Sequence, residues 1–171
     1  ADLQKVRVEA RTEGDAQGLR VTLDMNALST VWSPRNGYDH VVFTLFLELP
    51  GEDGGVTVMP MQNGELPQGM RWHRRLRSHG WSLALFDPTG ASASSEGRPI
   101  NRGVKVSTDP LSRSVTFTLS AAALGRPKTL SGARLWINTW DWDGTYRALQ
   151  PQSADFSFGG GTRDEPKWMD A

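Results

Sequence analysis

The densest run of side chains suited to ligand chemistry lies at 140–147 and reads Trp-Asp-Trp-Asp-Gly-Thr-Tyr-Arg. It holds three aromatic rings and two carboxylates in a chain that is 9% aromatic. Aromatic rings pack on apolar ligand faces, while carboxylates and guanidinium groups hydrogen-bond polar edges. The run therefore predicts a binding surface for a ligand with both kinds of edge. The alternative is that the tryptophans fill a core, with Asp143-Gly144 as a hairpin turn.

The strand expected at 133–142 leads into this run, and its alternation sorts the side chains onto two faces. One face carries Leu135, Ile137 and Thr139, and the other carries Trp136, Asn138, Trp140 and Trp142. An asparagine buried in an apolar face would need hydrogen-bond partners. The face that carries the tryptophans is therefore interpreted as open to solvent.

The carboxylates of Asp141 and Asp143 would lie roughly 7 Å apart on one strand, near the spacing of glycosidase carboxylate pairs. Catalytic pairs usually sit on separate elements across a cleft, so no catalytic residue is predicted. The histidines show no zinc spacing, and neither a Gly-x-Ser-x-Gly motif nor a phosphate loop is present. Calcium is left open as a cofactor, with Asp39, Asp141 and Asp143 as candidate oxygen ligands.

Composition excludes several classes of partner. The 19 basic and 19 acidic residues balance, so no long-range field favours nucleic acid or an anionic membrane. No apolar run approaches the roughly 18 residues of a membrane span. Cysteine is absent, which suits the cytosol and also a periplasmic or secreted protein without disulfides. The chain opens in strand-like sequence with no initiator methionine or signal peptide, so we expect a mature protein or an excised domain.

Eighteen glycines, ten prolines and scarce helical periodicity predict short strands joined by turns. Strand patterns are found at 3–11, 19–25, 41–49, 81–86, 103–107, 115–119, 133–142, 146–149 and 156–158. The run 41–49 is apolar on one face and mixed on the other, which predicts a central strand. The predicted fold is an all-β, antiparallel β-sandwich of the jelly-roll kind. Single helical turns are expected at 26–29 and 120–125.

Loops hold the remaining candidates. The loop 30–40 carries Trp32, and the long loop 50–69 carries Gln62 and Asn63. The basic run 70–77 contains Trp72 and is interpreted as an edge strand with its arginines in water. We expect one domain over 1–161, followed by a tail at 162–171 that is polar apart from Trp168.

Several segments resemble the C-terminal module of glucodextranase. These are Asn-Gly-Tyr-Asp-His-Val-Val-Phe at 36–43, the run 132–144, Tyr146-Arg147 and Phe-Gly-Gly-Gly at 158–161. That group, attached to bacterial α-amylase-family enzymes, is similar to the family 9 carbohydrate-binding modules and the DOMON β-sandwiches. The family often carries an Asp-Pro-x-Gly-Asp-Asp segment, which this sequence does not contain.

The resemblance implies a non-catalytic carbohydrate-binding module. Its ligand would be an α-glucan or maltooligosaccharide, and its partner would be the catalytic domain of a glycoside hydrolase. The implied location is periplasmic or secreted, in a bacterium. Family 9 modules clamp a sugar between two tryptophans, which suggests the same type of contact here. The candidate carbohydrate-binding residues are Trp140, Trp142, Trp32, Trp72, Asn138, Asp141, Arg147, Gln62 and Asn63.

Two other functions remain open. One is a structural module that docks on a catalytic domain without any ligand. The other is a haem-binding, DOMON-type electron-transfer domain. Its axial ligands would come from His40, His73, His79, Met59, Met61 and Met70.

Overall fold

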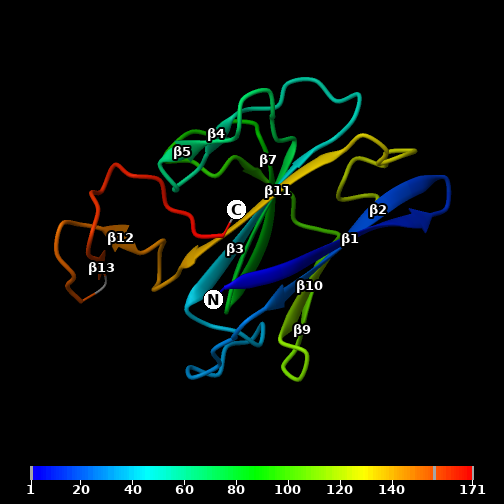
Figure 1. Cartoon of the computed structure of the whole chain (residues 1–171). Coiled ribbons are helices and arrows are strands. Elements are labelled where there is room, and N and C mark those ends of the chain that lie inside the picture. Colours follow the sequence, from blue (N-terminus) through cyan, green and yellow to red (C-terminus); the bar gives the residue numbers. More distant parts are fainter. Residues whose placement is uncertain (1, 156, 171) are drawn as a thin grey trace.

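The computed structural model describes residues 2–155 and 157–170 and contains two antiparallel sheets packed face to face (Figure 1). The first sheet has the order β1 (Leu3–Glu13), β2 (Ala16–Met25), β10 (Ser114–Leu119) and β9 (Val104–Asp109). The second has the order β11 (Arg134–Asp141), β3 (Val41–Glu48), β6 (Arg74–His79), β7 (Ser82–Asp87) and β8 (Arg98–Pro99). The prediction of an antiparallel β-sandwich is confirmed.

Two small ribbons complete the strands. β4 (Val58–Met59) pairs with β5 (Gly64–Glu65), and β12 (Ala148–Leu149) pairs in parallel with β13 (Ser157–Phe158). Phe156 of the strand expected at 156–158 lies outside the described residues, as do Ala1 and Ala171.

The expected helical turns at 26–29 and 120–125 are wrong, because the described residues contain no helix. Within 120–125 the Leu124 N–H donates to the Ser120 carbonyl at 3.2 Å, but the chain then closes at Gly125, where φ is +85°. A single turn cannot repay the entropy of fixing its residues. Accordingly, none of the described residues forms a helix that could cross a membrane.

The main core lies between the two sheets. Strand alternation places Leu19, Val21 and Leu23 of β2 against Phe43 and Leu45 of β3. β3 lies between β11 and β6 with its residues 41–47 all buried, so the prediction of a central strand is confirmed. Ile137 of β11 faces this core, whereas Trp140 packs in a separate cluster on the other face of the sheet.

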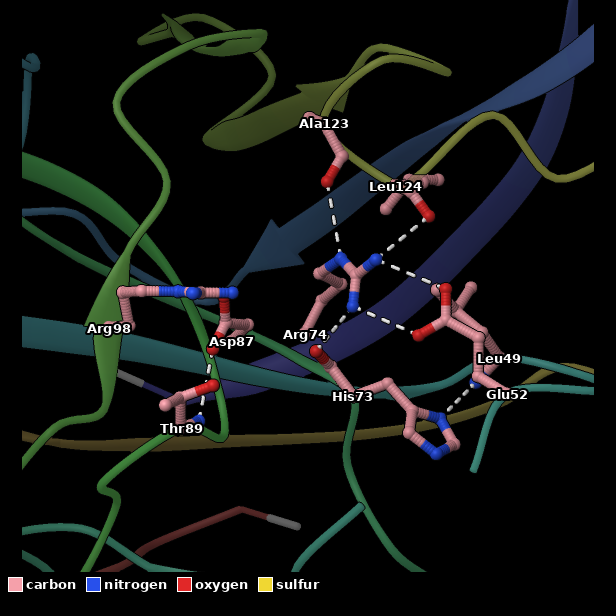
Figure 2. Close-up of polar contacts among 9 residues, drawn as sticks. All are labelled: Leu49, Glu52, His73, Arg74, Asp87, Thr89, Arg98, Ala123 and Leu124. Carbon is pink, nitrogen blue, oxygen red and sulfur yellow. Dashed lines mark hydrogen bonds and ion pairs between the residues drawn. The ribbon is translucent and has the colours of Figure 1, made fainter. Parts of the chain in front are cut away.

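The basic run was wrongly placed at an edge, because β6 lies between β3 and β7. Figure 2 shows why Arg74 tolerates this position. Its guanidinium donates to the carbonyls of Ala123 and Leu124, each at 3.2 Å, and pairs with Glu52 at 3.0 Å. Arg74 therefore joins the 120–125 turn and the 50–69 loop to the second sheet. An ion pair of Arg98 with Asp87 joins β8 to β7 in the same view.

The outer face of the second sheet is covered by loops. Phe46 and Met59 pack with Trp72 in one cluster, and Val42, Trp140 and Tyr146 form another. The covering segments come from the 50–73 region and from residues beyond 142. The central strand β3 is thus buried on both faces.

Arg75 is fully buried within this outer layer. Its Nη2 donates to the Tyr146 hydroxyl at 3.0 Å and to the Pro60 carbonyl at 3.3 Å, and its Nη1 lies 3.4 Å from Glu96. The guanidinium also lies 5.7 Å from the centre of the Phe46 ring. A charge without water is tolerated only when it is paired and hydrogen-bonded in this way.

The C-terminal segment packs against the second sheet. The Met169 N–H donates to the Thr139 carbonyl at 2.6 Å, and the Lys167 N–H donates to the Gln62 carbonyl at 2.8 Å. Trp168 packs against the cluster around Trp72, and a Cβ at Gly64 would overlap its ring. The segment expected to be a polar tail therefore contributes to the outer layer.

We predict that Arg75→Ala lowers the free energy of unfolding by about 3 kcal/mol, because it removes the donor to the Pro60 carbonyl and the Tyr146 hydroxyl and leaves Glu96 paired with Arg77 alone. Urea denaturation measures this change. Arg102→Ala, at an exposed arginine in the β8–β9 connection, is the matched control and should change the value by less than about 0.5 kcal/mol. Equal effects of the two substitutions would contradict a structural role of Arg75.

Candidate functional site

Five ring side chains gather at one end of the sandwich, where β3 and β7 begin and β6 and β11 finish. We call Trp32, His40, His79, Trp81 and Trp142 the aromatic cluster. The Trp32 ring lies 3.8 Å from His40 and 6.3 Å from Trp81. The His79 ring is stacked on Trp142 at 4.2 Å. This end of the sandwich lies at the lower left in Figure 1, where β3 begins and β11 ends.

Two indoles of the aromatic cluster are open to solvent. Trp32 is 47% exposed and Trp81 is 46% exposed, and their ring planes are inclined by 30°. Trp142 is half-buried beneath His79, with the Arg77 guanidinium 5.5 Å from the centre of its ring. The cluster therefore leaves the rings of Trp32 and Trp81 accessible to a ligand, while the other rings pack beside them.

The loop 26–40 positions Trp32 through the buried carboxylate of Asp39. Asp39 accepts a hydrogen bond from the Trp32 N–H at 2.7 Å and lies 2.7 Å from His40 Nδ1. Burial raises the pKa of Asp39, but hydrogen bonds from Ser29, Trp32 and His40 outweigh it and leave the pKa lowered. His40 itself has φ of +60°, a conformation that a non-glycine residue seldom adopts. The carboxylate thus holds the backbone turn that brings the two rings together.

Asn36 fixes the same loop to the β6–β7 turn. Its side-chain amide donates to the His79 carbonyl at 2.7 Å and to the Ser82 carbonyl at 3.2 Å. Gly80 allows the close approach, because a Cβ there would lie 2.6 Å from the Tyr38 carbonyl oxygen. Trp32 and Trp81 therefore belong to loops that are joined by hydrogen bonds.

Polar groups lie beside the aromatic cluster. The Arg147 guanidinium pairs with Asp141 at 2.8 Å and with Asp143 at 3.2 Å. Burial raises the pKa of Asp141, although the positive charge of Arg147 opposes the shift. The Trp142 N–H donates to the His40 carbonyl at 3.2 Å, which connects this group to the loop 26–40.

The candidate calcium ligands do not fit a calcium site. A guanidinium bridges Asp141 and Asp143, and Asp39 is engaged with Trp32 and His40. Calcium requires six to eight oxygen ligands. The described residues contain no group of three or more acidic, histidine or cysteine side chains placed to hold a metal.

Trp140 is buried, contrary to the expectation that its face of the strand is open to solvent, and the candidate Trp72 is buried as well. Trp140 is 5% exposed and Trp72 is fully buried. Their indole N–H groups donate to backbone carbonyls, of Arg147 at 2.9 Å and of Val58 at 2.8 Å. Each ring anchors a covering loop to the second sheet.

The amide candidates are also engaged within the protein. Gln62 Nε2 donates to Asn138 Oδ1 at 2.9 Å, and both side chains are fully buried. Asn63 donates to the backbone carbonyls of Arg163 and Glu165. Of the predicted binding residues, the structure brings Trp32, Trp142, Asp141 and Arg147 to one end and places the others in the outer layer.

Trp81 was not singled out from the sequence as a binding residue. It was counted as the first residue of a strand, whereas it occupies the turn before β7. The sequence signal for this turn is Gly80, which stands between two strand-like runs.

The candidate haem ligands are divided between the outer layer and the aromatic cluster. His73 Nδ1 accepts a hydrogen bond from the Leu49 N–H at 2.9 Å, as Figure 2 shows. Met59 and Met70 pack in the outer layer. His40 and His79 stack on tryptophans at the end of the sandwich.

Comparison with known proteins yields one family. A family model described as the C-terminal binding-module, SLH-like, of glucodextranase matches residues 1–171. No curated protein matches the chain.

His79 generates a prediction about pH. Burial, followed by the positive charge of Arg77, lowers the pKa of His79 to about 4, below its value of 6.5 in an unfolded chain. The unfolded state therefore binds a proton more readily, and stability contributed by neutral His79 is lost as pH falls from 6.5 towards 4.

We expect His79→Gln to reduce the loss of stability between pH 7 and pH 4, because glutamine does not titrate. Urea denaturation of both proteins at several pH values measures the difference. Lowered carboxylate pKa values also reduce stability in acid, but they are common to both proteins. Parallel curves for the two proteins would show that His79 titrates normally.

Proposed function

The chain belongs to the family of C-terminal binding modules of glucodextranase, and from this membership we propose that it binds an α-glucan through the aromatic cluster. Modules of this family are non-catalytic parts of a glycoside hydrolase. The module would hold the substrate polymer while the catalytic domain cleaves it. The proposal includes a periplasmic or secreted location in a bacterium, where polysaccharide substrates are encountered.

The observation that carries the proposal is the pair of exposed indoles, Trp32 and Trp81, whose centres lie 6.3 Å apart. A pyranose presents a face rich in C–H groups, which packs on an aromatic ring and loses contact with water. Hydroxyl groups at the sugar edge would meet the polar side chains beside the cluster, including Asp141 and Arg147. Aromatic surface of this kind, surrounded by polar groups, suits a sugar better than a purely apolar ligand.

The inclination of the two rings supports an α-linked chain. Trp32 and Trp81 are inclined by 30° and do not form one flat surface. An α-1,4-linked glucan curves from one residue to the next, whereas a β-1,4-linked glucan is a flat ribbon. Successive sugars of a curved chain can therefore rest on the two inclined rings in turn.

We expect weak binding, because water already solvates sugar hydroxyls well. A dissociation constant of roughly 10 µM to 1 mM corresponds to about 4 to 7 kcal/mol. Maltoheptaose should change the tryptophan fluorescence on titration, and cellohexaose should do so less. Calorimetric titration measures the same constants independently.

Trp32→Ala and Trp81→Ala should each weaken maltoheptaose binding about tenfold or more, because each removes one stacking surface. The exposed rings contribute little to the core, so both variants should fold. Val8→Ala is the control, since Val8 is also exposed, at 52%, but lies on β1 away from the aromatic cluster.

Unchanged affinity in both tryptophan variants would refute this site. If no oligosaccharide binds, and the same variants weaken attachment to the catalytic domain, the cluster is a docking surface and the sugar-binding proposal fails.

A further inference from the structure

The strand β1 has an open outer edge. It is the longest strand at 11 residues, and in the described part of the chain it pairs only with β2. Every residue of β1 after Leu3 is exposed, and Val6 and Val8 are 39% and 52% exposed. Long edges with apolar side chains readily add another strand, and natural proteins usually cover or shorten them.

The edge strands of the second sheet are better protected. β8 has two residues, and β11 is met by Met169 at Thr139. Nearer its start, β11 carries Arg134, whose guanidinium pairs with Glu48 at 2.6 Å. β9, the other edge strand of the first sheet, has only six residues and is half-buried at every second position. β1 is therefore the longest and most exposed edge among the described strands.

The apolar face of β1 is not closed by the opposite sheet. Two adjoining cavities, of about 410 Å³ and 430 Å³, lie between β1 and β11. Val8 lines both of them, and Leu135 of β11 also lines both. The sandwich is therefore open along this side, and the side chains of Val6, Val8 and Ala10 gain little burial from their own chain.

The hairpin determines which backbone groups of β1 face outward. A two-residue turn, Gly14-Asp15, joins the pair Glu13 and Ala16. The two residues that flank such a turn exchange backbone hydrogen bonds. Along the hairpin, pairs that exchange such bonds alternate with pairs that do not. The N–H and C=O groups of Val6, Val8 and Ala10 therefore point to the open edge and have no partner on β2.

We propose that the outer edge of β1 pairs with the β1 strand of a second copy of this chain, antiparallel, with Val8 on the two-fold axis. This register pairs residues 5–11, the regular part of the strand beyond the irregularity at 3–5, with Lys5 opposite Arg11 of the partner subunit at each end. Val8 exchanges backbone hydrogen bonds with Val8 of the partner subunit. The two four-stranded sheets become one continuous sheet, with an isologous interface.

Charge complementarity favours a second copy as the occupant. Arg7 lies opposite Glu9 of the partner subunit, and the symmetry makes this contact twice. Both residues stand in pairs without backbone hydrogen bonds to the neighbour, where cross-strand side chains approach most closely. Lys5 faces Arg11 of the partner subunit, and this repulsion partly offsets the attractive contacts. The apolar stripe continues across the axis, because Val6 stands beside Ala10 of the partner subunit.

Sedimentation equilibrium of the whole chain tests the proposal. The chain should show a reversible monomer–dimer equilibrium between micromolar and millimolar concentrations. Val8→Pro should abolish the dimer, because it removes an outward N–H and no bond to β2. Val8→Ala keeps that N–H and should retain the dimer.

Charge exchange tests the register. Arg7→Glu and Glu9→Arg should each weaken the dimer about tenfold, since each turns two attractive contacts into repulsive ones. The double variant R7E/E9R should restore it. Arg7 also pairs with Asp24 at 2.5 Å, so thermal melting checks that each variant stays folded.

Three outcomes would overturn the proposal. They are a chain that remains monomeric at all concentrations, a dimer that Val8→Pro does not affect, and a double variant that stays as weak as the single ones. If Val8→Pro weakens only the association with a catalytic domain and no self-association is found, the edge belongs to that partner and the second copy is rejected.

Discussion

The buried guanidinium of Arg75 is the interaction on which the outer layer of the second sheet depends. A cation buried at this position is tolerated only because the covering loops supply partners in place of water. Its partners come from three separate segments, through Pro60, Glu96 and Tyr146. The Tyr146 hydroxyl also lies 3.1 Å from Thr44 Oγ1, so the same network reaches β3. The loops are thus held over the sheet by the hydrogen bonds and ion pair of Arg75 as well as by apolar packing.

This constraint explains why the end of the sandwich, and not its face, carries the exposed rings. With the outer face occupied by loops, Trp72 and Trp140 anchor those loops. A ligand can reach only side chains that stand beyond the strand ends. There the connections after β2 and after β6 meet, and each contributes one exposed indole, Trp32 and Trp81.

The fold was predictable from the sequence to a large extent, because alternation reports which side chains share a face. The pattern of 41–49 identified a strand that is buried on both faces. The pattern of 133–142 placed Ile137 and Trp140 on opposite faces of their strand. Alternation does not report what covers a face. Asn138 is satisfied by Gln62, which is 76 residues away in sequence. Likewise, the arginines of 70–77 resembled a solvated edge because their partners lie in distant loops.

The candidate site was only partly predictable for a similar reason. Trp32 was found from its residue type and its position in a loop, and Trp142 from the dense aromatic and acidic run at 140–147. Trp81 joins them only through the contact between two turns, which no local pattern encodes. Asp39 was assigned to a cation, whereas its carboxylate accepts the Trp32 N–H. Local sequence identifies side chains that could bind, and tertiary contacts decide which of them meet.

The two hydrogen bonds between Asn36 and the β6–β7 turn have a thermodynamic consequence. Because Asn36 donates to both His79 and Ser82, the conformational entropy of the loop 26–40 is already lost when the chain folds. A ligand arriving at Trp32 does not have to order that loop. Association with this surface should therefore resemble contact with a rigid template, with a small change in heat capacity and a rate governed mainly by diffusion and orientation.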